Sequence, residues 1–279
     1  MSILAAALLG LVQGISEFLP ISSSGHLSVL QNFFGINTQE GESQLFFSVL
    51  LHLGTLVSVF IAYWEDIVGM VREAFGFFQD IRHPKPDDGE PKPVRRLVFM
   101  IIIATLPMLI IVPIWDAVEQ LFYNTLFIGI AFIATGLILF LSDKIQNGRK
   151  TEKTMTFVDA LIIGASQAIA VMPGLSRSGS TISTGMAVGL NRTFAVKFSF
   201  LLSIPAIMGA NIITLTRALN EGIDTSLIPA FLIGTLVAMV SGYFAIRLTK
   251  LLAQKGKFGK FCYYCFTVGI ITIVLTIVL

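Results

Sequence analysis

The stretch Leu11-Val-Gln-Gly-Ile-Ser-Glu-Phe-Leu-Pro-Ile-Ser-Ser-Ser-Gly-His26 places polar residues inside an apolar run that extends from residue 3 to about residue 34. A helix that crosses a bilayer needs about 20 largely apolar residues, and Glu17, Pro20 and the serines interrupt this run. We interpret it as two short helices that flank a polar loop, which is typical of a re-entrant hairpin. A signal peptide is the alternative, but the segment has no basic start and no small-residue cleavage site.

A second interrupted run extends over residues 157–190 and is broken by Pro173-Gly-Leu-Ser-Arg-Ser-Gly179. The two broken runs align with each other at a constant offset of 154 residues. We therefore expect the chain to consist of two copies of one unit, residues 1–150 and 151–279. The matched pairs are Gly10 with Gly164, Gln13 with Gln167, Ser22 with Ser176, Ser24 with Ser178, and Gly25 with Gly179.

The composition of the whole chain is that of an integral membrane protein. Of its 279 residues, 54% are hydrophobic and 13% are charged, and the mean hydropathy is +0.82. A soluble chain carries about 25% charged residues. This excludes a soluble enzyme, because 19 basic and 17 acidic side chains could not cover so much apolar surface. The net charge of only +2 argues against a nucleic-acid partner.

Six windows are apolar and long enough to cross a bilayer, three after each interrupted run. Because three is odd and a re-entrant hairpin does not cross, the second copy begins on the opposite side of the membrane, and the repeats are inverted. The sequence thus predicts an all-α integral membrane protein with two inverted repeats, each a re-entrant helix hairpin plus three transmembrane helices. The windows are about 44–64, 97–115 and 122–141 in the first copy, and about 198–216, 227–246 and 261–279 in the second.

The basic residues test this topology independently. With the six windows as spans, all of the 19 Lys and Arg residues except Arg177 and Arg217 fall on one side of the membrane. The positive-inside rule assigns that side to the cytoplasm. Both termini then face outward, the 65–96 connection is cytoplasmic, and the first hairpin enters from outside while the second enters from the cytoplasm. The two polar tips can therefore meet inside the membrane.

Glu17 and Arg177 are the ionisable residues that lie deep in the two hairpins. A charge at the centre of a membrane costs about 2.5–3.5 kcal/mol on insertion scales, so such a residue usually faces a partner or a polar cavity. One interpretation is that the two side chains simply pair with each other. The many polar groups around them favour a site with chemistry of its own.

The two tips have the composition of an anion-binding site. Hydroxyls, glycines and free backbone N–H groups that lead into a new helix form a cradle for phosphate, and the planar guanidinium of Arg177 suits phosphate oxygens. Helix capping explains any single one of these serines equally well. The candidate phosphate-binding residues are Ser22, Ser24, Gly25, Ser176, Arg177, Ser178 and Gly179.

The first tip also carries the parts of a hydrolytic site. His26 follows the serines closely enough for one hydroxyl to lie within hydrogen-bond reach, which would provide a nucleophile and a base. Glu17 can activate a nucleophile or, with Gln13 one helical turn earlier, bind a hard divalent cation such as Mg²⁺ or Ca²⁺ through oxygen. Together these parts suit the transfer of a phosphoryl group to water.

Three other residues have simpler interpretations. We expect His52, in the first span, to be a core histidine with its polar atoms satisfied, although it could face the cavity. Cys262 and Cys265 have the spacing of a redox or metal motif, but they lie in a late apolar run without a second cysteine pair. We interpret them as small apolar residues.

The two quoted stretches resemble the signature motifs of the undecaprenyl pyrophosphate phosphatase family, also called the bacitracin-resistance proteins. The length, the order of the motifs and the inverted repeats agree over nearly the whole chain. The resemblance implies a multi-pass hydrolase of the bacterial inner membrane that removes the terminal phosphate of undecaprenyl pyrophosphate. This reaction recycles the lipid carrier of cell-wall synthesis, and sequestration of the same lipid explains the link with bacitracin resistance.

The resemblance also implies which residues act. It assigns the acidic motif to Gln13 and Glu17, the serine to Ser23, the histidine to His26 and the arginine to Arg177. It further implies dependence on a divalent cation and a site open to the outer side. Many members carry a second Glu where this chain has Gln13. That departure weakens a mechanism in which two carboxylates hold the metal, and it puts more weight on Glu17.

The rival hypothesis is a transporter, either a polyprenyl-phosphate flippase or a small-anion carrier, because inverted repeats with broken helices are common in transporters. The expected partners are a polyprenyl pyrophosphate lipid and membrane lipids, and the sequence leaves open whether the chain forms a homodimer. A purely structural scaffold would leave Glu17 and Arg177 at depth without a reason.

Overall fold

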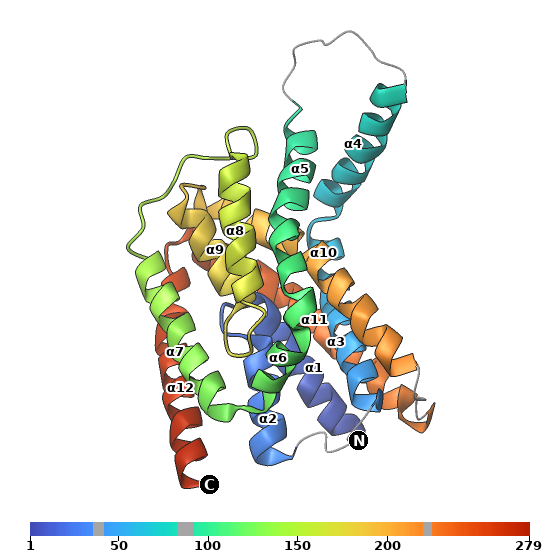
Figure 1. Ribbon diagram of the computed structural model, residues 1–279, viewed down its shortest axis with the longest axis vertical. Coiled ribbons are helices and arrows are strands. Elements are labelled where there is room, and N and C mark those ends of the chain that lie inside the picture. Colours follow the sequence, from blue (N-terminus) through green and yellow to red (C-terminus); the bar gives the residue numbers. More distant parts are fainter. Residues whose placement is uncertain (36–41, 83–91, 220–224) are drawn as a thin grey trace.

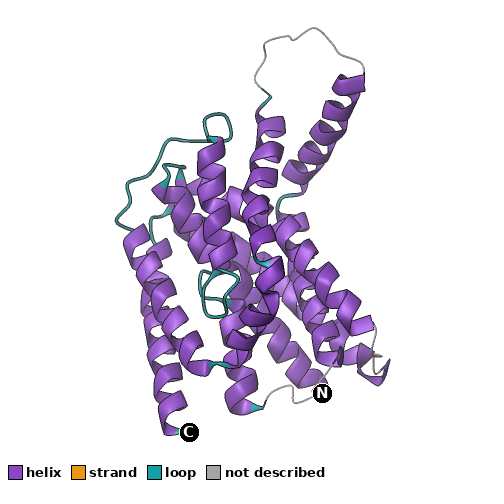
Figure 2. Ribbon diagram, viewed as in Figure 1, coloured by secondary structure: helices purple, strands orange, loops and turns teal. Residues whose placement is uncertain are grey.

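The computed structural model describes residues 1–35, 42–82, 92–219 and 225–279. Within these ranges Figure 2 shows helices joined by loops and no strand. The one trace of extended pairing is an isolated bridge between Lys150 and Leu190. The prediction of an all-α protein is therefore confirmed for the described part of the chain.

In each half of the chain, a pair of short helices is followed by longer ones. The first half of the chain holds α1 (Ile3–Phe18), α2 (Ser23–Phe34), α3 (Glu42–Ala62), α4 (Trp64–Arg82), α5 (Pro93–Thr105), α6 (Trp115–Gln120) and α7 (Thr125–Ser142). The second half holds α8 (Phe157–Ile169), α9 (Arg177–Ala187), α10 (Arg192–Leu219), α11 (Ile228–Gln254) and α12 (Phe261–Val278).

Among the described residues, five helical segments are long and apolar enough to cross a membrane, and α3 with α4 forms a sixth if that bent pair is one span. The two helices meet at 87°, so α4 turns away from the direction of α3. The chain is thus a multi-pass membrane protein. The five segments are Pro93–Tyr123, Thr125–Ser142, Arg192–Thr216, Ile228–Gln254 and Phe258–Val278.

The structure gives more detail for two of the predicted segments. The connection 65–96 begins with most of α4, while its residues 83–91 lie outside the described chain. The predicted window 97–115 is not one regular helix, because α5 ends at Thr105 and gives way to 3₁₀ turns around Pro107 and Pro113. Proline removes a backbone donor and clashes with the preceding turn, which accounts for this change.

The break in the first hairpin is shorter than the sequence suggested. The polar residues from Glu17 to His26 were expected in a loop, but α1 continues to Phe18 and α2 begins at Ser23. Only four residues separate the helices. Pro20 cannot donate a hydrogen bond to α1, and Ser22 has a φ of 69°, a conformation that L-residues rarely adopt.

The break in the second hairpin is placed differently from its prediction as well. Helix α8 ends at Ile169, before Pro173, and α9 begins at Arg177, so the motif from Arg177 to Gly179 is helical rather than a loop. Gly174 has a φ of 90°, and a Cβ there would lie 2.7 Å from the carbonyl oxygen of Ile128. Both the positive φ and the lack of space for a Cβ require glycine at this position.

Figure 1 shows both termini at one end of the helical bundle and the connection between α7 and α8 at the opposite end. Helix α1 packs very closely on α11, since a Cβ on Gly10 would lie 2.2 Å from the carbonyl oxygen of Gly234. Helix α8 packs in the same way on α5, where a Cβ on Gly164 would lie 2.2 Å from the carbonyl oxygen of Ala104. Glycines at corresponding positions therefore let both hairpins approach a long helix.

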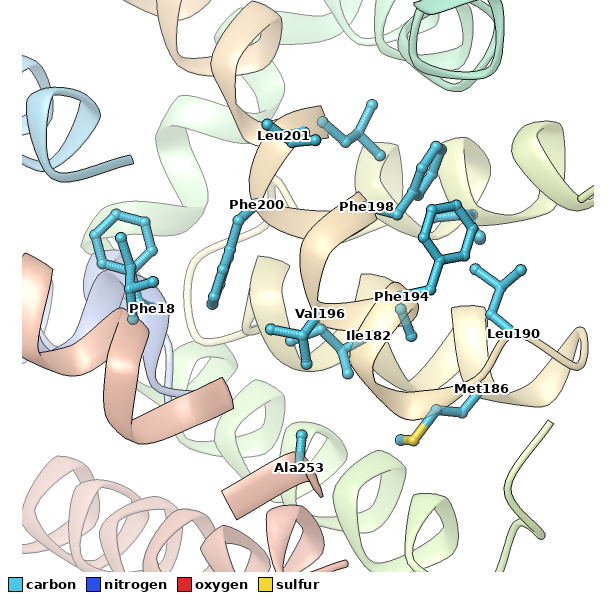
Figure 3. Close-up of a cluster of buried hydrophobic side chains, with 14 of the residues drawn as sticks. Phe18, Ile182, Met186, Leu190, Phe194, Val196, Phe198, Phe200, Leu201 and Ala253 are labelled. Carbon is cyan, nitrogen blue, oxygen red and sulfur yellow. The ribbon is translucent and has the colours of Figure 1, made fainter. Parts of the chain in front are cut away.

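The core lies directly beside the end of α1. Figure 3 shows Phe18 of α1 facing Phe200 of α10, within a cluster that includes Phe194 and Phe198. The rings of Phe18 and Phe200 meet edge to face with centroids 5.3 Å apart, and both side chains are fully buried. Because Phe18 directly follows Glu17, this contact fixes the end of α1 that carries the buried carboxylate.

Candidate active site

The two hairpin tips begin their second helices in the same way. The Ser22 hydroxyl caps α2 by accepting a hydrogen bond from the backbone N–H of Gly25 at 3.2 Å. The Ser176 hydroxyl caps α9 by accepting one from Gly179 at 3.1 Å. Such caps satisfy donors that the first helical turn leaves unpaired. The capping explanation therefore applies to these two of the predicted phosphate-binding serines.

The next serine in each tip lies beside the cap. The Ser24 hydroxyl is 3.3 Å from that of Ser22, and the Ser178 hydroxyl is 3.3 Å from that of Ser176. Ser178 is buried and donates to the Leu19 carbonyl oxygen at 3.2 Å, whereas Ser24 is half-buried. Ser178 thus joins the second tip to the first, and Ser24 is the more accessible of the two.

Side chains from the second half of the chain satisfy the carbonyl groups at the end of α1. Thr249 of α11 donates to the Phe18 carbonyl at 3.1 Å, and Ser178 binds the next carbonyl, that of Leu19. The Cys265 thiol lies 3.7 Å from the Pro20 carbonyl oxygen. Buried carbonyl groups need such partners. The first tip is therefore completed by α9, α11 and α12 together.

The carboxylate of Glu17 is the centre of the site. It is buried and receives hydrogen bonds from three side chains. Gln13 Nε2 and Ser23 Oγ both donate to Oε2, at 3.1 and 2.5 Å, and Arg177 Nη2 donates to Oε1. The predicted pairing of Glu17 with Arg177 is present, and a hydroxyl and an amide accompany it. A buried carboxylate with this many donors is well compensated for its desolvation.

Arg177 has binding capacity left over. The Nη2 atom is its one hydrogen-bonded guanidinium nitrogen among the described residues, and its side chain is 21% exposed while that of Glu17 is 5% exposed. Guanidinium carries five N–H donors in a planar fork. Several donors are therefore free to bind a second anion beside the carboxylate. Ser23 is half-buried and donates a hydrogen bond to the same carboxylate.

His26 does not contact a serine hydroxyl, contrary to the prediction. Its Nδ1 lies 2.7 Å from the Ser22 carbonyl oxygen and its Nε2 lies 2.7 Å from the Tyr264 hydroxyl of α12. The ring stacks on Tyr264 and meets Phe132 edge to face. The reason is local: Ser22 is one helical turn before His26, so its carbonyl is the nearest acceptor. The hydrogen-bond partner of the Ser23 hydroxyl is instead Glu17.

Two residues at the tips, Thr135 and Tyr264, were not predicted. Thr135 of α7 donates to the Gly174 carbonyl at 3.0 Å and accepts from the Ser176 N–H at 3.1 Å, so it fixes the second tip. Tyr264 binds His26. His52 donates from Nδ1 to the Ser48 carbonyl at 2.8 Å, as expected of a satisfied histidine. A polar aromatic residue in an apolar span was the available signal for Tyr264.

The residues around Glu17 suit a cation site in which the substrate provides some of the ligands. No group of three or more His, Cys, Asp or Glu side chains that could hold a metal occurs in the described ranges. The Gln13 Oε1 atom, however, is buried and has no hydrogen-bond partner. Mg²⁺ is commonly bound by one or two carboxylates together with substrate phosphates. One carboxylate, one free amide oxygen and a phosphate match that pattern. Cys262 and Cys265 are buried free thiols.

The family model described as bacitracin resistance protein BacA matches residues 6–271. The chain belongs to this family. Its relatives include an undecaprenyl-diphosphatase of Methanosphaera stadtmanae, 40% identical over 100% of both chains. Those of Carboxydothermus hydrogenoformans and Halothermothrix orenii are 41% and 39% identical, covering 97% and 99% of this chain and 96% and 98% of the relatives.

These relatives bear on the choice between the two hypotheses. Each of the three carries the name of an enzyme, and this chain is similar to them over nearly its whole length. Membership of the family therefore agrees with the resemblance in the two tip motifs. It does not favour the transporter hypothesis.

Proposed function

We propose that this protein is an undecaprenyl-diphosphatase. It removes the terminal phosphate of undecaprenyl pyrophosphate, which yields undecaprenyl phosphate, recycles the carrier for cell-wall synthesis and confers bacitracin resistance. The observation that carries the proposal is the cluster of Ser23, Glu17 and Arg177, joined by hydrogen bonds where the two hairpin tips meet. A hydroxyl, a carboxylate and a partly free guanidinium are the groups that phosphoryl transfer requires.

In this mechanism the terminal phosphate binds the free donors of Arg177, beside the first turn of α2. The Ser23 oxygen forms a bond to the terminal phosphorus, the bond from that phosphorus to the bridging oxygen breaks, and undecaprenyl phosphate leaves with the electron pair. The Ser23 proton moves to Glu17, whose Oε2 already accepts its hydrogen bond at 2.5 Å. Water then attacks the phosphoserine, the bond from phosphorus to the Ser23 oxygen breaks, and Glu17 returns the proton to that oxygen. Inorganic phosphate leaves with both protons of the water.

A direct attack by water, with Ser23 only as a phosphate ligand, is the alternative route. The two routes differ in one intermediate, so rapid acid quenching of the protein during turnover distinguishes them. We expect phosphoserine at position 23 in the wild-type protein and none in Ser23→Ala. A Ser23→Ala protein with near-normal turnover would rule out the nucleophile role and leave water attack.

A divalent cation, Mg²⁺ or Ca²⁺, is part of the proposal. Glu17 and the unpartnered Oε1 of Gln13 would hold it together with phosphate oxygens. When bound, it would supply positive charge that stabilises the transferred phosphoryl group. Glu17 keeps its role as acceptor of the Ser23 proton, and Arg177 keeps its role in binding and orienting the phosphate.

We further propose the topology of two inverted repeats with re-entrant hairpins. The equivalent caps at Ser22 and Ser176 support the internal duplication, because they are 154 residues apart, which is the offset between the two copies. Both termini lie at one end of the bundle and the basic connection 143–156 lies at the other (Figure 1). In this topology the termini are outside, the 65–96 connection is cytoplasmic and the site opens outward. The polyprenyl tail lies between hydrophobic helices.

The test is phosphate release by the purified protein in detergent, where there is no second compartment to transport into. We expect release of inorganic phosphate from a polyprenyl pyrophosphate in the presence of Mg²⁺ or Ca²⁺, and a large loss of release in Arg177→Ala. No release with any divalent cation would overturn the proposal. Release that is equal in the wild-type protein and in Arg177→Ala would overturn the assignment of this site.

A further inference from the structure

Tyr264 and His26 form a side-chain hydrogen bond between the last helix and the first tip. The Tyr264 hydroxyl lies 2.7 Å from Nε2 of His26, although 238 residues separate the two in the chain. The two rings are nearly parallel, at 12°, with centroids 5.6 Å apart. The edge of Phe132 closes another side, with centroids 5.0 Å apart. The imidazole is therefore held by two stacking or edge contacts and by a hydrogen bond at each nitrogen.

The partners of the ring decide its tautomer. The Ser22 carbonyl oxygen, 2.7 Å from Nδ1, can only accept a hydrogen bond, so Nδ1 carries the proton. In the neutral ring Nε2 then has the lone pair, and the Tyr264 hydroxyl must be its donor. The hydrogen bonds thus run in one direction, from Tyr264 to His26 and from His26 to the backbone of Ser22.

These two hydrogen bonds connect α12 with the turn that presents Ser23. Ser22 has the unusual φ of 69° and caps α2, and Ser23 follows it as the first helical residue. A residue held in a sparsely populated conformation needs surrounding contacts to keep it there. His26 binds the carbonyl of this residue, and Tyr264 holds His26.

We propose that Tyr264 is a positioning residue of the active site, acting through His26. It fixes the Nδ1–H tautomer and the orientation of the imidazole, and through the Ser22 carbonyl it holds the turn that places Ser23 on Glu17. The inference rests on the proposed phosphatase function. It adds a residue that neither the tip motifs nor the internal repeat indicated.

The neighbouring tyrosine provides a matched control. Tyr263 is on the same helix and is 68% exposed, while Tyr264 is 43% exposed. In the described part of the chain the Tyr263 side chain makes no hydrogen bond or ring contact. Tyr264→Phe and Tyr263→Phe each remove one hydroxyl and keep the aromatic ring, so stacking on His26 is retained. The hydroxyl lost in Tyr264→Phe binds His26, and the one lost in Tyr263→Phe does not.

The first measurement is phosphate release from a polyprenyl pyrophosphate. Loss of an ordinary hydrogen bond outside the fully buried core corresponds to about a 2- to 10-fold change in an equilibrium or rate. We expect kcat of Tyr264→Phe to fall within this range with KM nearly unchanged, and Tyr263→Phe to match wild type. Equal kcat values for both variants would overturn the proposal.

The second measurement asks whether Tyr264 acts through His26. In a double-mutant cycle, Tyr264→Phe should cost nothing further when it is added to His26→Ala. An additional loss equal to that in the wild-type background would show an independent, merely structural role and would overturn the proposal. The cycle also covers the case in which Tyr264→Phe weakens folding, because that cost would persist without His26.

The third measurement does not depend on catalysis. In detergent-solubilised protein labelled with ¹⁵N-histidine, the His26 signals should report a protonated Nδ1 and a hydrogen-bonded, unprotonated Nε2. Tyr264→Phe should shift the Nε2 signal and Tyr263→Phe should leave it unchanged. An unshifted Nε2 signal in Tyr264→Phe would overturn the pairing. If the wild-type protein released no phosphate but the signal shifted, the proposed function would fail while the pairing stood.

Discussion

Ser23 and Arg177 occupy the same position in their helices and bind the same carboxylate. Each is the first helical residue after a capping serine, and each hydrogen-bonds to Glu17. They are 154 residues apart, which is the offset of the internal match. Two copies of one turn thus present a hydroxyl from one tip and a guanidinium from the other. The copies also differ at Glu17, which corresponds to Val171, so the repeated structure carries a site because the copies differ at these two positions.

Arg177→Lys should lower phosphatase activity strongly although the charge is kept. Lysine has no planar fork, so it cannot bind Glu17 and a phosphate in the geometry that guanidinium allows. We expect kcat/KM to fall by about 100-fold or more, in the range seen when a preorganised donor to a transition state is lost. Arg72→Lys, on the exposed face of α4, is the control and should be neutral. Comparable activity of both variants would contradict a phosphate-binding role.

Much of the fold could be predicted from the sequence because apolar length and charge asymmetry are strong signals in a membrane. In the described chain, five of the six windows fall on helical segments long enough to cross a membrane, the window 44–64 falls on α3, and each interrupted run is a pair of short helices. The helix boundaries at the tips were wrong for a physical reason. Serine and glycine were interpreted as loop residues, but here they start helices, since a serine cap followed by small residues forms a compact first turn.

The residues of the site could be predicted from the sequence better than the contacts between them. Glu17 and Arg177 stood out because a charge at depth needs a partner. The pairing of Ser23 with Glu17 instead of His26 depends on which face of α2 each side chain occupies, and spacing alone leaves that open. Thr135 and Tyr264 come from α7 and α12, and nothing in a single sequence indicates that these spans reach the tips.

Gln13→Glu should lower the stability of the metal-free protein and should tighten metal binding. Gln13 Nε2 donates to Glu17, and a carboxylate in its place would lose that bond and face a like charge. We expect the metal-free protein to lose about 1–3 kcal/mol of stability. A second carboxylate should also lower the Mg²⁺ concentration needed for half-maximal activity. Thermal unfolding in EDTA and a Mg²⁺ titration check the two effects. Unchanged stability and metal dependence would contradict a cation site at Gln13.

Phe200→Ala should weaken both the fold and the site. Phe200 is fully buried against Phe18, next to Glu17, and truncating a buried phenylalanine costs about 3–5 kcal/mol. We expect a lower unfolding temperature and reduced phosphate release even where the protein stays folded, because the end of α1 loses its support. Phe78→Ala is the matched control, since Phe78 is 64% exposed on α4. Equal effects of the two substitutions would show that the contact with Phe18 does not position the tip.

Gly25→Ala tests how closely the two tips must approach. A Cβ at this position would lie 2.8 Å from Cα of Gly174 and 2.7 Å from the ring of Phe132, and the first of these is backbone that cannot rotate away. The tips would have to separate, which pulls Arg177 of the second tip away from Glu17 and Ser23 of the first. We therefore expect activity to fall by about 100-fold or more, while overpacking costs about 1–3 kcal/mol of stability.

Gly69→Ala supplies the comparison for this last substitution. A Cβ at Gly69 in α4 meets only Val94, at an ordinary 3.7 Å. Alanine is the better helix former by about 1 kcal/mol, so this variant should be as stable as wild type or more stable, and fully active. Gly25 is also helical, in the first turn of α2, so helix propensity alone would predict a gain there too. If Gly25→Ala were as active as Gly69→Ala, a joint site at the contact of the two tips would be ruled out.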